Sequence, residues 1–184
     1  DTSSRNLQKL IEQLLDYNRK LADTQVELEE VEIEPLVDMV ISAHSLPARA
    51  KMMHTEVELE EPVCLAEPML LMSVLDNLYS NAVHYGSESG TIYIRSRNVG
   101  SRLRIEVANT GTPIPEAERE MIFEPFFQGS LQRKGAVKGS GLGLSIAQDC
   151  IRRMHGELRL VDENDADVCF RIELPALEPE TSQQ

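Results

Sequence analysis

A long apolar segment between Pro68 and Gly86 constrains the fold more than any other part of this sequence. Proline fits the first turn of a helix and glycine commonly follows the last one, so we expect a helix over 68–85. One face of that helix is apolar, formed by Leu71, Val74, Leu75, Leu78 and Ala82. A face of this kind must be buried, and we expect it to pack on a sheet.

Segments that alternate apolar and polar residues with a period of two flank this helix and predict the strands of that sheet. The expected strands are 26–33, 55–60, 63–66, 91–97, 103–108, 157–161 and 167–174. A hairpin turn is expected at 98–102, and further helices over 35–46, 116–122 and 142–155, the last ended by Gly156. This order predicts an α+β fold in which helices cover one face of a mixed sheet.

The first segment has apolar residues at heptad spacing and predicts a separate helix over residues 1–24. The seam consists of Leu7, Leu10, Leu14, Tyr17 and Leu21, widened by Ile11 and Leu15. We interpret it as a helix that pairs with other helices, although packing on its own domain would give the same pattern. The remainder divides into a domain over 25–177 and a polar tail over 178–184.

The net charge of −13 argues against nucleic-acid binding, which needs basic surfaces, but not against binding a small phosphate ligand. No apolar run reaches the roughly 20 residues of a membrane helix, so we expect no direct membrane contact from this segment. Cys64, Cys150 and Cys169 lack the spacing of metal ligands. We expect them to be reduced, buried thiols of a cytoplasmic protein.

Two asparagines, Asn77 and Asn81, share one face of the long helix with His84. Asparagine is a poor helix former, and its amide oxygen is a suitable ligand for Mg²⁺, so this face is a candidate metal site. A solvated polar face is the alternative. Asn109-Thr110-Gly111 follows a strand directly, where Gly111 allows a flat ligand to approach the backbone, although a simple turn would look the same.

A glycine-rich entry to a helix supplies a candidate phosphate site. Gly139, Gly141 and Gly143 alternate with Ser140 and Leu142, so several N–H groups can point into one concavity. Cations precede this segment: Arg133, Lys134 and Lys138. They can meet a triphosphate or be ordinary surface charge. Ile122-Phe123-Glu124-Pro125-Phe126-Phe127 holds three of the four phenylalanines and is expected to anchor the connection.

In this order the four motifs resemble the N, G1, F and G2 boxes of the sensor histidine kinases in the GHKL ATPase superfamily. Leu65-Ala66-Glu67-Pro68 and Met154-His155-Gly156-Glu157 also resemble that family, and the first segment resembles the second helix of its dimerisation and phosphotransfer hairpin. The resemblance implies a Bergerat fold, a two-layer α/β sandwich that binds ATP and Mg²⁺.

The resemblance also implies roles for individual residues. Asn81 would ligate Mg²⁺, and Asn77 would lie near the phosphates. Tyr85 and Gly111 would line the adenine pocket. The glycines Gly139, Gly141 and Gly143, with Leu142, would hold the phosphates under a lid over 128–140 that carries the cations.

Two positions depart from the family pattern. Asn109 stands where an aspartate usually accepts a hydrogen bond from the adenine amino group, and an amide oxygen accepts it without a charge. His84 stands where lysine is common, so the charge there depends on pH. Both changes are expected to weaken ATP binding.

The resemblance implies a reaction in which a γ-phosphoryl group passes to a histidine and then to a response-regulator aspartate. ATP-hydrolysing relatives such as gyrase and MutL place a glutamate where this chain has Asn77, and an amide cannot take a proton from water at neutral pH. The acceptor histidine would lie on the first hairpin helix, which this chain lacks. The parent would be a homodimeric inner-membrane sensor with this part in the cytoplasm.

The sequence leaves two rival functions open. The first is a GHKL ATPase that drives conformational change, against which the Asn77 argument counts. The second is a non-catalytic module that uses a degenerate site to hold a partner, which Asn109 and His84 leave open. A rapid intrinsic ATPase rate would favour the first, and a nucleotide titration tests the second.

Overall fold

A computed structural model describes residues 5–6, 8–9, 11–12, 26–125, 127, 143–163 and 165–177 of this chain. Its strands are β1 (Glu29–Glu32), β2 (His54–Leu59), β3 (Val63–Ala66), β4 (Thr91–Val99), β5 (Arg102–Asn109), β6 (Glu157–Glu163) and β7 (Ala166–Pro175). Its helices are α2 (Ile33–Ala43), α3 (Ser45–Ala50), α4 (Pro68–Tyr85) and α5 (Gly143–Arg153), with a 3-10 turn, η1, over Glu116–Glu118.

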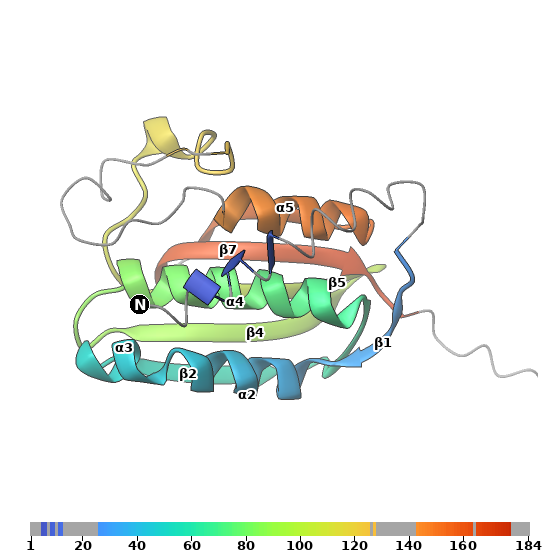
Figure 1. Ribbon diagram of the computed structural model, residues 1–184, viewed down its shortest axis with the longest axis horizontal. Coiled ribbons are helices and arrows are strands. Elements are labelled where there is room, and N and C mark those ends of the chain that lie inside the picture. Colours follow the sequence, from blue (N-terminus) through green and yellow to red (C-terminus); the bar gives the residue numbers. More distant parts are fainter. Residues whose placement is uncertain are drawn as a thin grey trace, which may run out of the picture.

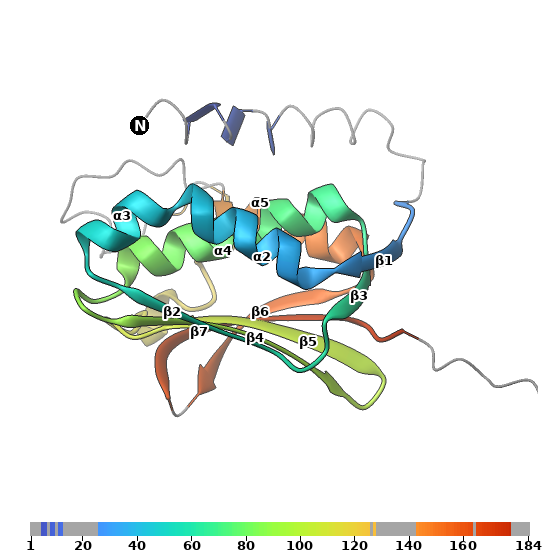
Figure 2. The same ribbon diagram turned by 90° about the horizontal axis from the view of Figure 1, so that it is seen from below.

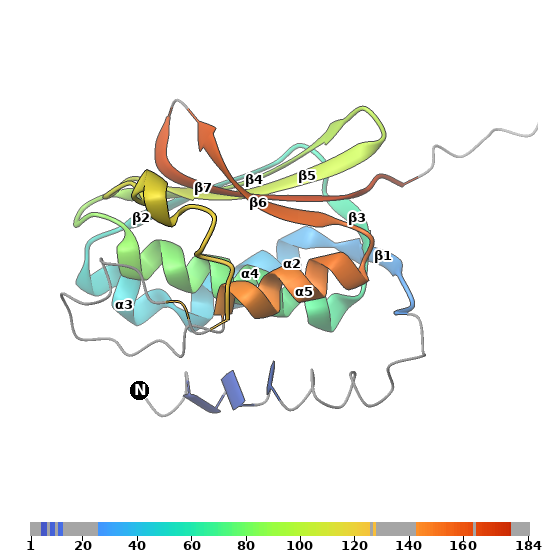
Figure 3. The same ribbon diagram turned by 90° about the horizontal axis from the view of Figure 1, so that it is seen from above.

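A five-stranded sheet in the order β2-β4-β5-β7-β6 forms one layer of the fold (Figure 1). β2 pairs with β4 in parallel, and the other neighbours are antiparallel, so the sheet is mixed as expected. β1 and β3 form a separate antiparallel pair at one end of the helices. The helices α2, α4 and α5 lie together on one face of the large sheet (Figure 2, Figure 3). The predicted α+β sandwich is therefore confirmed.

The helix α4 lies between α2 and α5 and contributes most of its apolar face to the core. The predicted core residues Leu71, Val74, Leu75, Leu78 and Ala82 are all buried. At its start the carboxylate of Glu67 accepts a hydrogen bond from the N–H of Leu70 at 2.7 Å, and Pro68 occupies the first turn. Burial on one side and capping at the start explain the bounds that the sequence predicted.

The end of α4 differs from a common glycine cap, because Gly86 has a φ of −66°. What requires glycine there is space: a Cβ atom on Gly86 would stand 2.2 Å from Cε of Met53 and 2.5 Å from the carbonyl oxygen of Ala82. The turn that follows α3 therefore packs tightly against the last turn of α4.

Two predicted helices are corrected by the structure. The helix expected over 35–46 is divided at His44 into α2 and α3. Pro47 explains the break, because it has no N–H to donate to the carbonyl of Ala43 and its ring would clash with that carbonyl. The helix expected over 116–122 is shortened to η1, and turns continue to Ile122. So short a segment, with little apolar surface to bury, does not sustain an α-helix.

The strands agree closely with expectation, although the hairpin turn is tighter. β4 and β5 pair up to Val99 and Arg102, so the turn has only Gly100 and Ser101 between them. Gly100 has a φ of 62°, a conformation that glycine adopts readily.

The domain boundaries stay predictions. The described residues of the first segment, 5–6, 8–9 and 11–12, are helical, and Ile11 packs on the core. The boundary at 24–25, the seam residues Leu7, Leu10, Leu14, Tyr17 and Leu21, and the tail over 178–184 lie outside the described residues.

Candidate functional site

The asparagines of α4 point away from its buried face, as their spacing predicted. Asn77 and Asn81 are both half-buried, and neither side chain has a hydrogen bond to another described residue. Their neighbour Asp76 contrasts with them, because its carboxylate lies 2.7 Å from Nε2 of His44 at the junction of α2 and α3. The two amides are thus available to a ligand within the part of the chain that the structure describes.

The first residue of α5 lies directly against this amide face. A Cβ atom on Gly143 would stand 3.0 Å from Oδ1 of Asn77, closer than most side-chain contacts. The start of a helix presents N–H groups that its own turns do not use, and its dipole adds positive potential. The structure therefore brings the start of α5 and the amide oxygen of Asn77 close together.

The described residues include only one member of the predicted glycine-rich motif, Gly143. Arg133, Lys134, Lys138, Gly139, Gly141 and Leu142, together with the predicted lid over 128–140, lie outside the described residues. Their roles stay predictions.

Gly111 joins the turn after β5 to the end of α4. Its φ is 154°, and a Cβ atom there would stand 2.8 Å from the carbonyl oxygen of Tyr85. A β-bridge links Gly111 to Gly86, and the N–H of Ser87 donates to the carbonyl oxygen of Thr110 at 3.0 Å. The close approach of two backbones explains why position 111 requires glycine.

Asp167 of β7 holds the same turn from the other side and was not predicted from the sequence. Its carboxylate accepts a hydrogen bond from the N–H of Gly111 at 2.8 Å. The contact joins residues 56 positions apart in the sequence, so no local sequence pattern predicts it.

Asn109, the last residue of β5, is only 3% exposed. Its Nδ2 donates to the carbonyl oxygen of Thr110 at 3.0 Å, and Oδ1 has no hydrogen bond to another described residue. The amide oxygen can therefore accept a hydrogen bond, as the aspartate that is usual at this position would do.

His84 lies at the end of α4 with its ring against that of Tyr85, at 4.5 Å between centroids and nearly perpendicular. Burial, followed by the positive charge of Lys51, lowers the pKa of His84 below its usual 6.5. The imidazole is therefore neutral at pH 7. Lys51 is a second residue that sequence reasoning missed.

The remaining motifs serve packing. Phe123 meets Phe170 of β7 edge to face at 6.1 Å, which supports the expectation that it anchors the connection. Glu67 and Met154, from the two flanking motifs, meet through the N–H of Glu67 and the sulfur of Met154 at 3.3 Å. Both pairs tie loops to the core rather than to the asparagine face.

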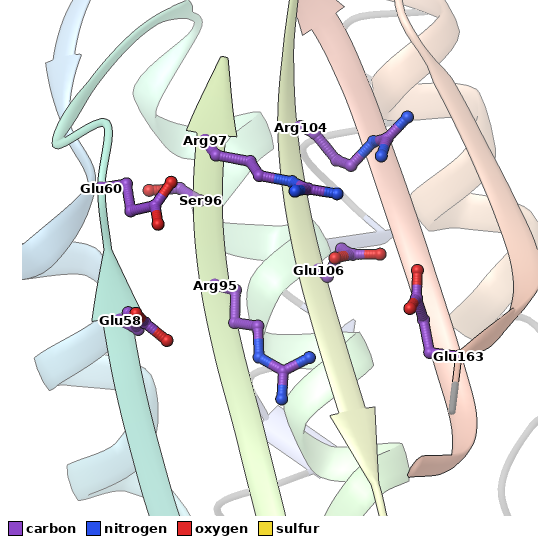
Figure 4. Close-up of a pocket in the computed structure, with 8 residues that line it drawn as sticks. All are labelled: Glu58, Glu60, Arg95, Ser96, Arg97, Arg104, Glu106 and Glu163. Carbon is purple, nitrogen blue, oxygen red and sulfur yellow. The ribbon is translucent and has the colours of Figure 1, made fainter. Parts of the chain in front are cut away.

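A charged cavity of about 250 Å³ lies on the face of the sheet that the helices leave open (Figure 4). Its lining mixes both signs, and most of these charges already have partners: Arg95 pairs with Asp165, and Arg171 lies 2.9 Å from Glu106 and 2.5 Å from Glu163. This network occupies the opposite side of the sheet from the asparagines. We regard it as an ion-paired surface, separate from the candidate site.

The three cysteines lie in the core as free thiols. Cys64, Cys150 and Cys169 are buried and unpaired, as predicted, and burial raises the pKa of Cys64 and of Cys150 to about 12. Among the described residues, no three His, Cys, Asp or Glu side chains are grouped as metal ligands. No described helix is long and apolar enough to cross a membrane.

Comparison with known proteins agrees with this arrangement. The chain is 78% identical over 176 residues to the sensor histidine kinase GlrK of Escherichia coli K12, covering 96% of this chain and 37% of that protein. The chain therefore spans little more than a third of the relative it matches.

Solved structures share the fold over almost the whole chain. The full-length histidine kinase ShkA, in complex with AMPPNP, matches with a TM-score of 0.74 and 28% identity over 97% of this chain and 37% of that one. The histidine kinase ThkA, in complex with the response regulator protein TrrA, matches with a TM-score of 0.68 and 27% identity over 96% of this chain and 49% of that one.

The sequence profile of one family covers the elements that build the site. It matches residues 66–178, from the end of β3 to beyond β7, and includes Asn77, Gly111 and Gly143. The resemblance stated from the motifs is thereby confirmed, and the chain belongs to the family of histidine kinase-, DNA gyrase B- and HSP90-like ATPases.

Proposed function

We propose that this domain binds ATP with Mg²⁺ beside α4 and delivers the γ-phosphoryl group to a histidine on a helical hairpin. One observation carries the proposal: motifs far apart in sequence meet along α4, with Gly143 against Asn77 and Gly111 against Tyr85. The first contact supports a phosphate site where the start of α5 meets α4, and the second supports a flat surface for the base beside the last residue of α4.

The amide face suits Mg²⁺. This ion takes oxygen ligands, keeps several waters and is usually held by one or two protein groups together with substrate phosphates. Asn77 and Asn81 offer amide oxygens without described protein partners, and the described residues near them form no competing cage of acidic ligands. Asn81 would hold the ion, and bound Mg²⁺ would supply neutralisation of phosphate charge.

The other residues would bind and orient the nucleotide. The N–H groups at the start of α5 would receive the phosphates, joined by the glycines, Leu142 and the cations that precede Gly143. Tyr85 and Gly111 would line the adenine pocket. Oδ1 of Asn109 would accept a hydrogen bond from the amino group of the adenine. Positioning and charge neutralisation would then account for most of the catalysis.

Transfer is favoured over hydrolysis because of Asn77. Its amide cannot remove a proton from water at neutral pH, so the site would not generate a hydroxide nucleophile. A histidine delivered from outside would react instead. The similarity to sensor histidine kinases supports a hairpin of the same parent as the source of that histidine.

We infer the wider setting from the relatives. ThkA was solved in complex with a response regulator protein, so a response-regulator aspartate is proposed as the next acceptor here. The parent is proposed to be a homodimer joined through its hairpin, with this domain on the cytoplasmic side of the inner membrane.

Calorimetric titration with a non-hydrolysable ATP analogue, with and without Mg²⁺, tests the proposal. We expect binding in both conditions and tighter binding with Mg²⁺. Absence of binding would overturn the proposal in favour of a non-catalytic module. Rapid hydrolysis of ATP by the isolated domain would instead favour an ATPase that drives conformational change.

A further inference from the structure

The ammonium group of Lys51 caps the last turn of α4. Its Nζ donates to the carbonyl oxygen of Val83 at 2.8 Å and to that of His84 at 2.9 Å. Carbonyls at the end of a helix lack intrahelical partners and carry the negative end of the helix dipole, so a cation is favoured there. Lys51 belongs to the turn after α3, more than thirty residues away in sequence.

Two further contacts make this turn a clamp on the end of α4. The carbonyl oxygen of Lys51 accepts a hydrogen bond from the N–H of Ser89 at 2.8 Å. The side chain of Met53 fills the space above Gly86, where a Cβ atom would stand 2.2 Å from Cε. The turn thus holds the segment from Val83 to Ser89 through a cation, a backbone hydrogen bond and an apolar contact.

The backbone of the clamp is itself unusual. Met52 has a φ of 53°, which non-glycine residues rarely adopt, and the residue is 69% exposed. Its N–H donates to the carbonyl oxygen of Arg49 at 2.9 Å, and the N–H of Met53 donates to that of Ala48 at 3.0 Å. These bonds end α3 and direct Lys51 and Met53 towards α4 on either side of an exposed residue.

We propose that Lys51 is a positioning residue for nucleotide binding: by holding the last carbonyls of α4 it sets the placement of His84 and Tyr85 at the site. The inference rests on the proposed function, because it assigns Lys51 to the same ATP site. It goes beyond the motifs, since Lys51 belongs to none of them.

Charge couples Lys51 to His84 as well. Among the described residues, the groups that face His84 are Lys51 from the turn after α3 and the ring of Tyr85 on its own helix. Glu88, in the loop after α4, acts on Lys51 and raises the pKa of that lysine, while burial lowers it more. Removal of the ammonium group therefore changes the surroundings of His84 in a way that NMR can detect without any nucleotide.

The test compares Lys51→Met with Arg49→Met. Both remove one positive charge from the same region, but Arg49 is exposed and its side chain has no described partner. We expect Lys51→Met to weaken binding of a non-hydrolysable ATP analogue by about tenfold, as expected for the loss of charged hydrogen bonds. Lys51→Arg, which keeps charge and donors, should recover most of the affinity, and Arg49→Met should match wild type.

The second readout is the titration of His84 followed by NMR in the absence of nucleotide. We expect Lys51→Met to raise the pKa of His84 and Arg49→Met to leave it unchanged. Equal analogue affinity in the two methionine variants would overturn the inference. If wild type itself bound no nucleotide, the proposed function would fail, while an unchanged His84 titration would separately show that Lys51 does not act on this residue.

Discussion

Asn77 and Gly143 stand so close that a side chain at position 143 would press on the amide: a Cβ atom there would lie 3.0 Å from Oδ1 of Asn77. The contact joins the asparagine face of α4 to the start of α5. It therefore places an amide oxygen beside the start of α5, which is the arrangement on which the proposed phosphate binding depends.

Gly143→Ala should displace the Asn77 amide, which lies 3.0 Å from the position of the added methyl. Because the proposed function puts that amide beside the phosphates, we expect binding of the ATP analogue to weaken about tenfold. The measurement is calorimetric titration on the variant, with circular dichroism to check folding. A double-mutant cycle with Asn77→Ala isolates the contact. If the loss caused by Gly143→Ala were the same in both backgrounds, the two residues would be acting independently.

Asn81→Ala should remove the advantage that Mg²⁺ gives to nucleotide binding. The residue offers an amide oxygen without a described protein partner, so its truncation leaves no buried donor unsatisfied and the fold should persist. Titrations with and without Mg²⁺ on this variant and on Ser80→Ala, its neighbour in α4, give the comparison. A Mg²⁺ effect that survives in a folded Asn81→Ala variant would remove Asn81 from the metal site.

Gly111→Ala should both destabilise the domain and abolish nucleotide binding. A φ of 154° is strained for any residue with a side chain, and the new methyl would stand 2.8 Å from the carbonyl oxygen of Tyr85. The cost in stability is expected to be about 1–3 kcal/mol. Thermal unfolding measures it.

Substitution of Asp167 should perturb the turn at Gly111 less than Gly111→Ala does. Asp167→Asn keeps an oxygen that can accept from the N–H of Gly111, whereas Asp167→Ala does not. We expect the alanine variant to bind the analogue more weakly than the asparagine variant, with similar unfolding temperatures. Equal affinities would show that the hydrogen bond does not position the turn.

The affinity for ATP should rise as the pH falls from 8 to 6, because protonation of His84 places a positive charge near the phosphates. The pKa of His84 is lowered by burial and by Lys51, so the residue is neutral at the upper end of this range. His84→Gln should lose the part of the pH dependence that does not belong to ATP itself. His84→Lys should bind more tightly at pH 8.

Linkage gives the corresponding effect on stability, with a defined sign. Because the pKa of His84 is lower in the folded state than its usual 6.5, the unfolded chain binds the proton first as the pH falls. The contribution of His84 to stability is therefore complete above about 6.5 and is lost as the pH falls through the folded value. Urea unfolding measures the free energy of unfolding of wild type and of His84→Gln across this range. We expect the wild-type value to fall relative to that of His84→Gln as the pH falls.

The periodic elements were the most predictable part of the molecule. The apolar stripe of α4 and the alternation of apolar and polar residues in β4 and β5 predict each element and its buried face from local sequence. Each of these elements has the expected bounds within a few residues. The helix 35–46 was mispredicted because its apolar spacing continues past His44, whereas the missing N–H of Pro47 decides where the helix ends.

The site was predictable where a motif supplies an unusual residue type, as with Asn77 in an apolar helix or Gly111 after a strand. Lys51 and Asp167 were not predicted as part of the site, because an ordinary charged residue in a turn or strand belongs to no recognisable sequence pattern. Their importance comes from the backbone groups they meet, which only the folded chain brings near. Local sequence patterns do not predict contacts of this kind between distant segments.

The last prediction concerns the phosphoryl acceptor. None of the four histidines, His44, His54, His84 and His155, lies in the opening segment, and His44 is already paired with Asp76. We therefore expect this chain to bind ATP without labelling itself when the γ-phosphate is radioactive. A separate polypeptide carrying a complete hairpin should become labelled, slowly unless it pairs with the segment 7–21, because proximity limits the transfer. Acid-labile, base-stable label identifies phosphohistidine, and Asn81→Ala should prevent it. Label on one of this chain's own histidines would show that the acceptor does not lie outside it.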